Sequence, residues 1–237
     1  MTMNINSLLS SICHRSRFPV LALAAASVVS GCAVTQPDED PWQDVTAYSW
    51  PADKVLHYRI DDLEDGTQSF STIPTTLTDS VYRDSQKFYN LGDPKLRAWR
   101  GFLPLKDTII TLNGHFPMDV ALVAPLEKGH KWISGIRTVV TDTGEVTLRW
   151  YGEILERYSY RKIEGEVYKN VLEVQYKPEF FTDPSNKVVR TLFYVEGKGV
   201  VQELKSHIRD NGSDDPNTLP KLLERVLLIK TEDAPGL

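Results

Sequence analysis

The stretch that decides the fold is residues 154–177, which read ILERYSYRKIEGEVYKNVLEVQYK. Two runs that alternate apolar or aromatic residues with charged ones are separated there by Glu164-Gly165. Alternation with a period of two is typical of a half-buried β-strand, and a short break that contains glycine is typical of a hairpin turn. The stretch therefore predicts two long antiparallel strands.

The same pattern continues on both sides of this hairpin. Turn residues at 65–66, 113–114, 142–144 and 197–199 separate further β-branched and aromatic runs. We expect strands at 54–60, 67–73, 107–112, 130–141, 145–151, 187–196 and 200–208. The sequence therefore predicts a mainly β fold with a single large curved antiparallel sheet, like a half-barrel or an open barrel, and at most one short helix.

Two segments are compatible with more than one structure. Residues 78–89 fit a helix or a polar strand, and we favour a strand at their start. Residues 219–229 place Leu222, Leu223, Val226 and Leu227 at helical spacing, whereas Arg225 to Lys230 alternate like a strand. Helix and strand both remain open for this second segment.

The N-terminus has the pattern of a secretory signal. Arg15 and Arg17 precede an apolar run at 18–29, which is too short to span the roughly 30 Å of a bilayer's hydrocarbon core as a helix. The run ends in Val29-Ser30-Gly31-Cys32, which resembles the lipobox of bacterial lipoproteins. This resemblance implies that Cys32 becomes the lipidated N-terminus and holds the chain at a membrane through a diacylglycerol and an acyl chain such as palmitate.

The rest of the N-terminal region refines this interpretation. The resemblance to Gram-negative lipoproteins implies that Ala33, where Asp would favour the inner membrane, directs the protein to the periplasmic face of the outer membrane. Cys13 lies in the removed segment, so no disulfide is expected. We expect a signal peptide at 1–31, the lipidated Cys32 and a flexible tether at 32–53, a β domain at 54–231 and a tail at 232–237.

Charge excludes one class of partner. The chain has a net charge of −5, which becomes −7 when the signal peptide with Arg15 and Arg17 is removed. Binding to nucleic acid depends on Lys and Arg that displace counterions from phosphates. We therefore expect no nucleic acid as a partner.

Three segments, at 125–132, 165–174 and 193–201, look like signatures of uncharacterised bacterial lipoproteins. They read PLEKGHKW, GEVYKNVLEV and FYVEGKGVV. The resemblance implies an antiparallel half-barrel sheet. It implies no catalytic residues, because turn glycines and core hydrophobic residues make up the signatures.

No motif in the chain indicates an enzyme, a cofactor or a metal. Asp142-Thr143-Gly144 matches half of an aspartic-protease pair, but it occurs once and suits a hairpin turn. The acidic run at 61–66 resembles a calcium loop, but Leu63 stands where an oxygen ligand is needed. The histidines lack the spacing of metal ligands. We therefore assign no catalytic residues and no metal or cofactor site. The sequence gives no support for an enzymatic activity.

The most suggestive group of side chains is aromatic and basic, and we place it on two consecutive strands. It comprises Arg149, Trp150, Tyr151, Arg157, Tyr158, Tyr160 and Arg161. These aromatic rings fit best a core with a rim of solvated arginines, and the alternative is a concave surface that binds an acyl chain, a glycan or a peptide strand. Our candidate binding residues are Trp150, Tyr151, Tyr158 and Tyr160.

These observations suggest two functions, of which we favour the first, and a third that has less support. The first is a non-enzymatic lipoprotein whose β domain binds a protein partner or an envelope component, with an accessory role in envelope assembly or maintenance. The second is a carrier or receptor for a lipid or lipoprotein, which would need a deep apolar cavity. A hydrolase is the third, and it would need a histidine and a carboxylate to converge in a polar cleft.

Overall fold

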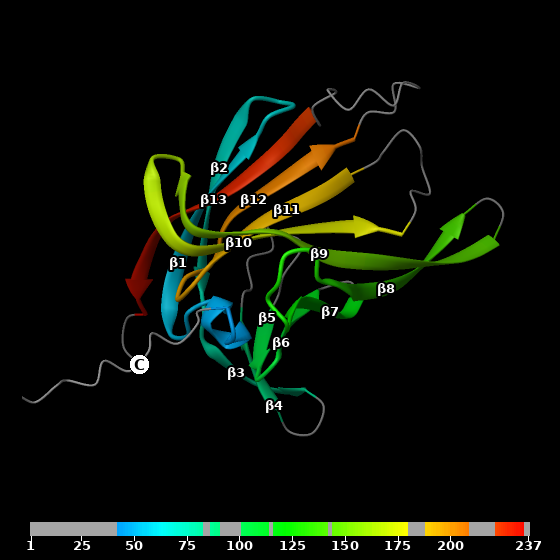
Figure 1. Cartoon of the computed structure of the whole chain (residues 1–237), viewed down its shortest axis with the longest axis horizontal. Helices are drawn as coiled ribbons and strands as arrows, with labels where there is room; N and C mark the ends of the chain where they lie inside the picture. The colour runs from blue at the N-terminus through cyan, green and yellow to red at the C-terminus, as the bar shows by residue number, and fades with distance from the viewer. Residues whose placement is uncertain are drawn as a thin grey trace, which may run out of the picture. The chain divides into compact units, whose positions relative to one another are not determined.

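The computed structural model describes residues 42–82, 86–90, 101–113, 116–141, 144–179, 188–208 and 221–234 (Figure 1). These residues belong to one compact unit, Pro37–Leu237. The expected signal peptide, Cys32 and the first part of the expected tether lie outside the described residues. Within the described ranges, no helix is long and apolar enough to cross a membrane.

Eight antiparallel strands form a large sheet, as the sequence predicts. Their spatial order is β2-β1-β13-β12-β11-β10-β9-β8. The strands are β1 (Lys54–Asp62), β2 (Thr67–Pro74), β8 (Lys131–Thr141), β9 (Gly144–Ile163), β10 (Glu166–Pro178), β11 (Val188–Val195), β12 (Gly199–His207) and β13 (Lys221–Asp233). Every ladder is antiparallel, and β13 lies between β1 and β12, which joins the two ends of the described domain.

A second sheet of five strands adds to the single sheet that the sequence predicts. Its order is the chain order β3-β4-β5-β6-β7, and all of its ladders are antiparallel. The strands are β3 (Leu77–Tyr82), β4 (Gln86–Asn90), β5 (Gly101–Leu105), β6 (Thr108–Asn113) and β7 (Phe116–Val123). Figure 1 shows β5, β6 and β7 below the large sheet, with β7 near β8.

The structure resolves both ambiguous segments as strands. The first becomes β3 and β4, as we favoured for its start, and the second becomes β13. In β13, Leu223, Val226, Leu227 and Leu228 are buried. The apparent helical spacing arises because β13 carries apolar residues on both faces and is bulged opposite β1 and β12.

The placement of the aromatic group on two strands is wrong. A single strand of 20 residues, β9, runs from Gly144 to Ile163 and carries the whole group. Gly152 falls in the gap between the strands that we expected at 145–151 and 154–163, but it lies inside β9. Glycine suits this position because a Cβ there would lie 2.3 Å from the ring of Trp132. A glycine that makes room for a neighbouring ring looks the same in a sequence as a glycine in a turn.

The expected tether extends into the folded core. Val45–Tyr48 form the 3-10 helix η1, capped by the Asp44 side chain, and Val45, Tyr48 and Trp50 are buried. Gly199 has a φ of +72°, and a Cβ on it would lie 2.8 Å from the Cα of Trp50. The turn between β11 and β12 therefore packs closely against Trp50, and the fold begins before the expected boundary at residue 54.

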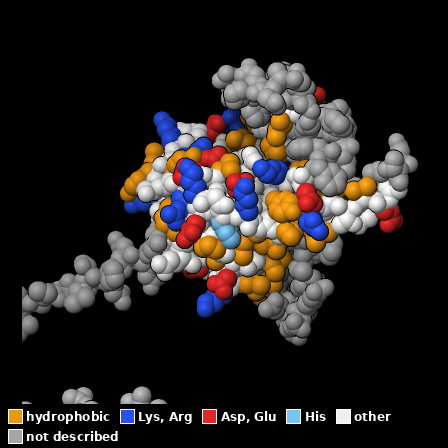
Figure 2. Space-filling model, turned by 45° about the vertical axis from the view of Figure 1, so that its right-hand side comes forward, with side chains coloured by type: hydrophobic (Ala, Val, Ile, Leu, Met, Phe, Trp, Pro, Cys, Tyr) orange, Lys and Arg blue, Asp and Glu red, His pale blue; other side chains and the backbone are white. Residues whose placement is uncertain are grey.

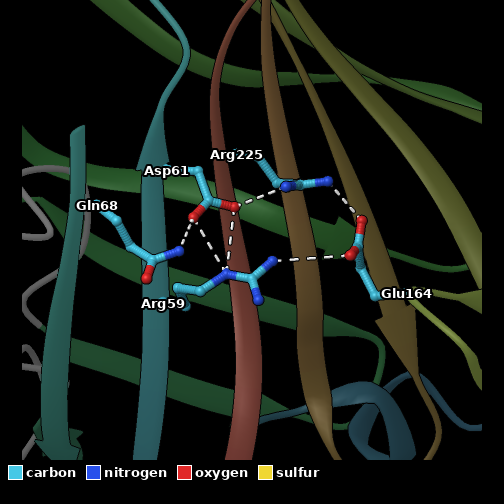
Figure 3. Close-up of polar contacts among 5 residues, drawn as sticks. All are labelled: Arg59, Asp61, Gln68, Glu164 and Arg225. Atoms are coloured by element: carbon cyan, nitrogen blue, oxygen red, sulfur yellow. Dashed lines mark hydrogen bonds and ion pairs between the residues drawn. The ribbon is translucent and has the colours of Figure 1, made fainter. Parts of the chain in front are cut away.

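A polar network fastens the tip of the β9–β10 hairpin to the far end of the large sheet (Figure 3). Asp61 on β1 accepts hydrogen bonds from Gln68 at 2.9 Å and from Arg225 at 2.9 Å, and it pairs with Arg59. Glu164 in the hairpin turn pairs with Arg225 and lies 3.7 Å from Arg59. Each carboxylate therefore meets guanidinium groups, which balances the charges.

Charges of both signs are mixed over the surface that Figure 2 presents. Lys and Arg side chains alternate there with Asp and Glu among hydrophobic ones, over the part of that face that is described. Such a surface has no broad field of one sign.

Candidate functional site

A pocket with both apolar and polar lining lies between the two sheets, where β6 and β7 face β8 to β11. Its volume is about 120 Å³. The lining residues come from six strands and are Thr111, Asp119, Ala121, Ser134, Arg137, Trp150, Tyr176, Arg190 and Tyr194. Clefts between packed elements that combine aromatic walls with a few polar groups are the usual form of a ligand site.

An ion pair between the sheets forms one wall of the pocket. The Nη2 of Arg137 on β8 donates to the Oδ2 of Asp119 on β7 at 2.6 Å. The Arg137 guanidinium also lies 5.1 Å from the ring centroid of Trp150, which is within the range of a cation–π contact. Gly135 makes this arrangement possible, because a Cβ there would lie 2.3 Å from the Oδ1 of Asp119.

Hydrogen bonds beside this pair hold β7 against β8. The Nε1 of Trp132 donates to the carbonyl oxygen of Val120 at 3.0 Å, and the Ser134 hydroxyl donates to the same oxygen at 2.9 Å. The Thr111 hydroxyl donates to the carbonyl oxygen of Asp119 at 3.2 Å. The position of Asp119 is therefore set from both of its neighbouring strands.

Two buried tyrosines and an arginine form the opposite wall. The Tyr176 hydroxyl donates to the carbonyl oxygen of Ala121 and lies 2.9 Å from the Tyr194 hydroxyl. Burial raises the pKa of Tyr176 and of Tyr194 far above the ordinary value of a phenol. Both hydroxyls therefore stay protonated. Because the Tyr176 proton goes to Ala121, the Tyr194 hydroxyl donates to the Tyr176 oxygen.

Arg190 keeps its charge in this wall. Its Nε donates to Glu203 on β12. Burial lowers the pKa of Arg190, but the contact with Glu203 outweighs burial, so the pKa ends above the ordinary value. Glu203 is not among the lining residues, so the lining carries two guanidinium groups and one carboxylate.

Only one of the four predicted binding residues, Trp150, lies in this pocket. The Tyr151 hydroxyl is 3.5 Å from Glu179, and the Tyr158 hydroxyl donates to Glu173 at 2.7 Å. Tyr160 is 63% exposed, and the Lys169 amino group lies over its ring. The four residues therefore do not form one binding surface.

Sequence reasoning missed most of the pocket. On β11, the inward positions are Arg190, Leu192 and Tyr194, so a charged residue shares a face with two buried apolar ones. That mismatch in the alternation is the signal that marks Arg190. The sequence contains no comparable signal for Asp119, because its partner Arg137 lies on another strand across the sheet junction.

The lining does not contain the pair of residues expected for the hydrolase considered above. None of the lining residues is a histidine, so the pocket does not bring a histidine and a carboxylate together. Among the described residues, no group of three or more His, Cys, Asp or Glu side chains is placed to hold a metal ion. The pocket is also far below the roughly 300 Å³ at which sites for drug-sized molecules begin, so it is too small for an acyl chain.

No protein-family model matches the chain, and no curated protein is similar enough to count as a relative. The chain is similar to a solved structure from Bacteroides fragilis, described as an exported protein with a YmcC-like fold. The two chains are 9% identical, with a TM-score of 0.36 over 78% of this chain and 97% of the other. A TM-score this low carries no conclusion about function, and the resemblance to lipoproteins remains a prediction.

Proposed function

We propose that the protein is an exported lipoprotein, anchored through Cys32 at the periplasmic face of the outer membrane, whose β domain binds an envelope component without catalysing a reaction. The observation that carries the proposal is the lipobox Val29-Ser30-Gly31-Cys32 behind a short apolar run. Two or three acyl chains stabilise membrane attachment by about 0.8 kcal/mol for each buried methylene, so attachment is permanent.

The pocket supports the binding half of the proposal. Its walls come from two separate sheets and are tied together by the Arg137–Asp119 pair and by the Tyr176 hydrogen bond to Ala121. The side chains of such a site are already ordered before a ligand enters. Binding therefore costs little conformational entropy. The small size of the pocket favours this function over the carriage of a lipid.

Labelling with radioactive palmitate in a Gram-negative host tests the anchor. We expect the wild-type chain to take up label and Cys32→Ser to take up none. Cys13→Ser is the matched control, because Cys13 lies in the segment that is removed, and this variant is expected to label like the wild type. Equal labelling of Cys32→Ser and the wild type would contradict the anchor.

The residue after the cysteine tests the destination. We expect Ala33→Asp to move the labelled protein from the outer-membrane fraction to the inner-membrane fraction. Separation of the two membranes on a sucrose gradient, followed by immunoblotting, measures this shift. A wild-type chain that already sediments with the inner membrane would contradict the outer-membrane assignment and leave the lipid anchor intact.

A further inference from the structure

The two edges of the large sheet differ in how they are protected. β2 forms one edge and β8 forms the other. The exposed side chains of β2 are polar apart from Phe70, and the strand ends in Pro74, which has no N–H to offer a further strand. β8 contains no proline, and it exposes the large apolar side chains of Ile133, Ile136 and Val140. Edges of natural sheets usually carry charges or proline that prevent pairing with another chain, so β8 is the less protected edge.

Residues 136–141 of β8 and 144–149 of β9 form a two-stranded arm. β10 runs beside β9 only as far as Trp150, and one further backbone hydrogen bond joins Glu179 to Arg149. Beyond that point, the strands that the structure describes give β9 no partner except β8. Figure 1 shows the arm projecting beyond the rest of the large sheet. Two strands alone are marginally stable in water, so a strand added along β8 would stabilise the arm.

The first part of β8 is occupied by contacts with β7. The side chains of Trp132 and Ser134 both donate to the carbonyl oxygen of Val120. The ladder between β8 and β9 is also bulged in this part, and a bulge interrupts pairing with another strand. The regular part of the β8 edge therefore begins after the bulge, at Ile136.

The side chains along this regular part match a second copy of themselves. Ile136, Thr138 and Val140 lie on one face of β8, and all three are exposed. In an antiparallel pair centred on Thr138, the two Thr138 side chains face each other, and Ile136 of each copy faces Val140 of the other. Pairs of threonines and pairs of apolar β-branched residues are favourable when they lie directly opposite each other. A pair centred two residues earlier would run into the bulged part of β8.

The charges on β9 are compatible with the same pairing. Arg149 lies opposite Ile136, and Glu145 lies opposite Val140. Each row of four side chains across the two copies therefore begins with Arg149 of one copy and ends with Glu145 of the other, and no like charges face each other. The net charge of −5 on each chain opposes this contact only weakly, because physiological salt screens charges beyond about 8 Å.

We propose that the exposed edge of β8 pairs with the β8 edge of a second copy of this chain. The two edges form an antiparallel, two-fold symmetric ladder over residues 136–140, and the sheet continues from one copy into the other. The same patch serves both copies, as two-fold symmetry requires. A ladder this short belongs to the transient interfaces that bury less than about 1,200 Å² in total, so monomers and dimers exchange. The proposal depends neither on the lipid anchor nor on the pocket.

Single cysteines test the register of the ladder. The full-length chain is expressed in a Gram-negative host, and intact cells are treated with copper phenanthroline. We expect Thr138→Cys to form a disulfide-linked dimer, because directly opposite side chains have Cβ atoms about 5 Å apart. Ile136→Cys alone is expected to form none, because the two substituted positions lie four residues apart along the ladder, at about 13 Å. Ile136→Cys and Val140→Cys are expected to link to each other when they are expressed together.

The other edge of the sheet provides the matched control. Ser69 is exposed on β2, so Ser69→Cys measures the links that arise from random collisions at the membrane. The wild-type chain measures any links through Cys13 and Cys32. Neither control is expected to form more than traces of dimer.

Charge variants test the same pairs without a disulfide at positions 136 and 140. Ile136→Glu places a carboxylate opposite Arg149 of its own chain, and Val140→Lys places an ammonium group opposite Glu145, so the arm is expected to keep its structure. In the Thr138→Cys background, each of these variants is expected to lower the yield of dimer about tenfold, because a two-fold interface buries the unpaired charge twice. The double variant pairs the new carboxylate of one copy with the new ammonium group of the other, and it is expected to recover most of the yield.

Four outcomes would overturn the proposal. The first is a Thr138→Cys dimer no more abundant than that of Ser69→Cys, and the second is equal linking by Ile136→Cys alone and by Thr138→Cys. The third is a double charge variant that links as weakly as the single variants. The fourth is a Thr138→Cys chain that links only to a different envelope protein, which would make the β8 edge a docking site for that protein.

Discussion

At the scale of single residues, Gly152 determines how closely β9 packs against the ring of Trp132. A Cβ at this position would lie 2.3 Å from two atoms of the Trp132 ring, and that ring is itself held by its hydrogen bond to Val120. We expect Gly152→Ala to lower the free energy of unfolding by about 1–3 kcal/mol, because the ring cannot move without loss of the contact between β8 and β7. Urea denaturation at neutral pH measures this change.

Gly66 provides the matched control for this variant. It has a φ of +68° and nothing within 4 Å of an added Cβ. Asparagine tolerates that backbone conformation, so Gly66→Asn is expected to change the free energy of unfolding by less than about 0.5 kcal/mol. A Gly152→Ala protein as stable as the wild type would contradict the packing described for Trp132.

Turn glycines and core glycines explain why residue identity predicts some features and not others. Gly66 and Gly197 lie in turns with positive φ, where the sequence places them correctly. Gly135 and Gly152 lie inside strands, and their role depends on Asp119 and Trp132, which approach from other strands. A sequence read on its own contains no information about that approach.

At the scale of elements, Asp61 joins β1, β2 and β13 on the face where the β9–β10 hairpin tip is fastened (Figure 3). Burial raises the pKa of Asp61, but hydrogen bonds from Gln68, Arg225 and Arg59 outweigh it, so the pKa ends below the ordinary 3.8. A carboxyl group with a lowered pKa stabilises the fold above its unfolded-state pKa, and this contribution is lost as the pH falls through the folded-state value.

We therefore expect Asp61→Asn to lower the free energy of unfolding by about 2 kcal/mol at neutral pH, because two guanidinium groups lose their shared carboxylate. The difference from the wild type should start to shrink as the pH falls below about 3.8, because the unfolded chain takes up the proton first, and it should be smallest below the lowered folded-state pKa. Urea denaturation across this pH range measures both effects.

Asp233→Asn is the control for Asp61→Asn. Asp233 also pairs with a cation, Lys54, but its side chain is 89% exposed, so this variant is expected to unfold at nearly the same urea concentration as the wild type. An Asp61→Asn protein whose deficit is the same at every pH would show that the carboxylate charge is not the source of the stability.

The elements themselves were largely predictable, because alternation and turn chemistry are local properties. The β1–β2 hairpin, the β9–β10 hairpin and the β11–β12 turn follow from patterns within a few residues. The split of β9 into two strands was wrong, because the alternating pattern pauses at residues 152–153. The burial of Val45 and Tyr48 was missed, because their polar neighbours suggested a tether.

At the scale of the whole molecule, the pocket exists because two sheets meet. Its wall residues lie as far apart in the chain as Thr111 and Tyr194, and the decisive pair of Asp119 and Arg137 crosses from one sheet to the other. Pairing between sheets depends on tertiary contacts that no local pattern encodes. Trp150 was found because aromatic residues stand out in a sequence, and the charged residues around it were not.

Native mass spectrometry of the protein released gently from its membrane tests the central claim most directly. The account predicts a chain that begins at Cys32 and carries acyl chains, together with a second species that carries a bound envelope component. A chain that begins elsewhere or lacks lipid, and that shows no bound species, would contradict a lipid-anchored protein that binds an envelope component.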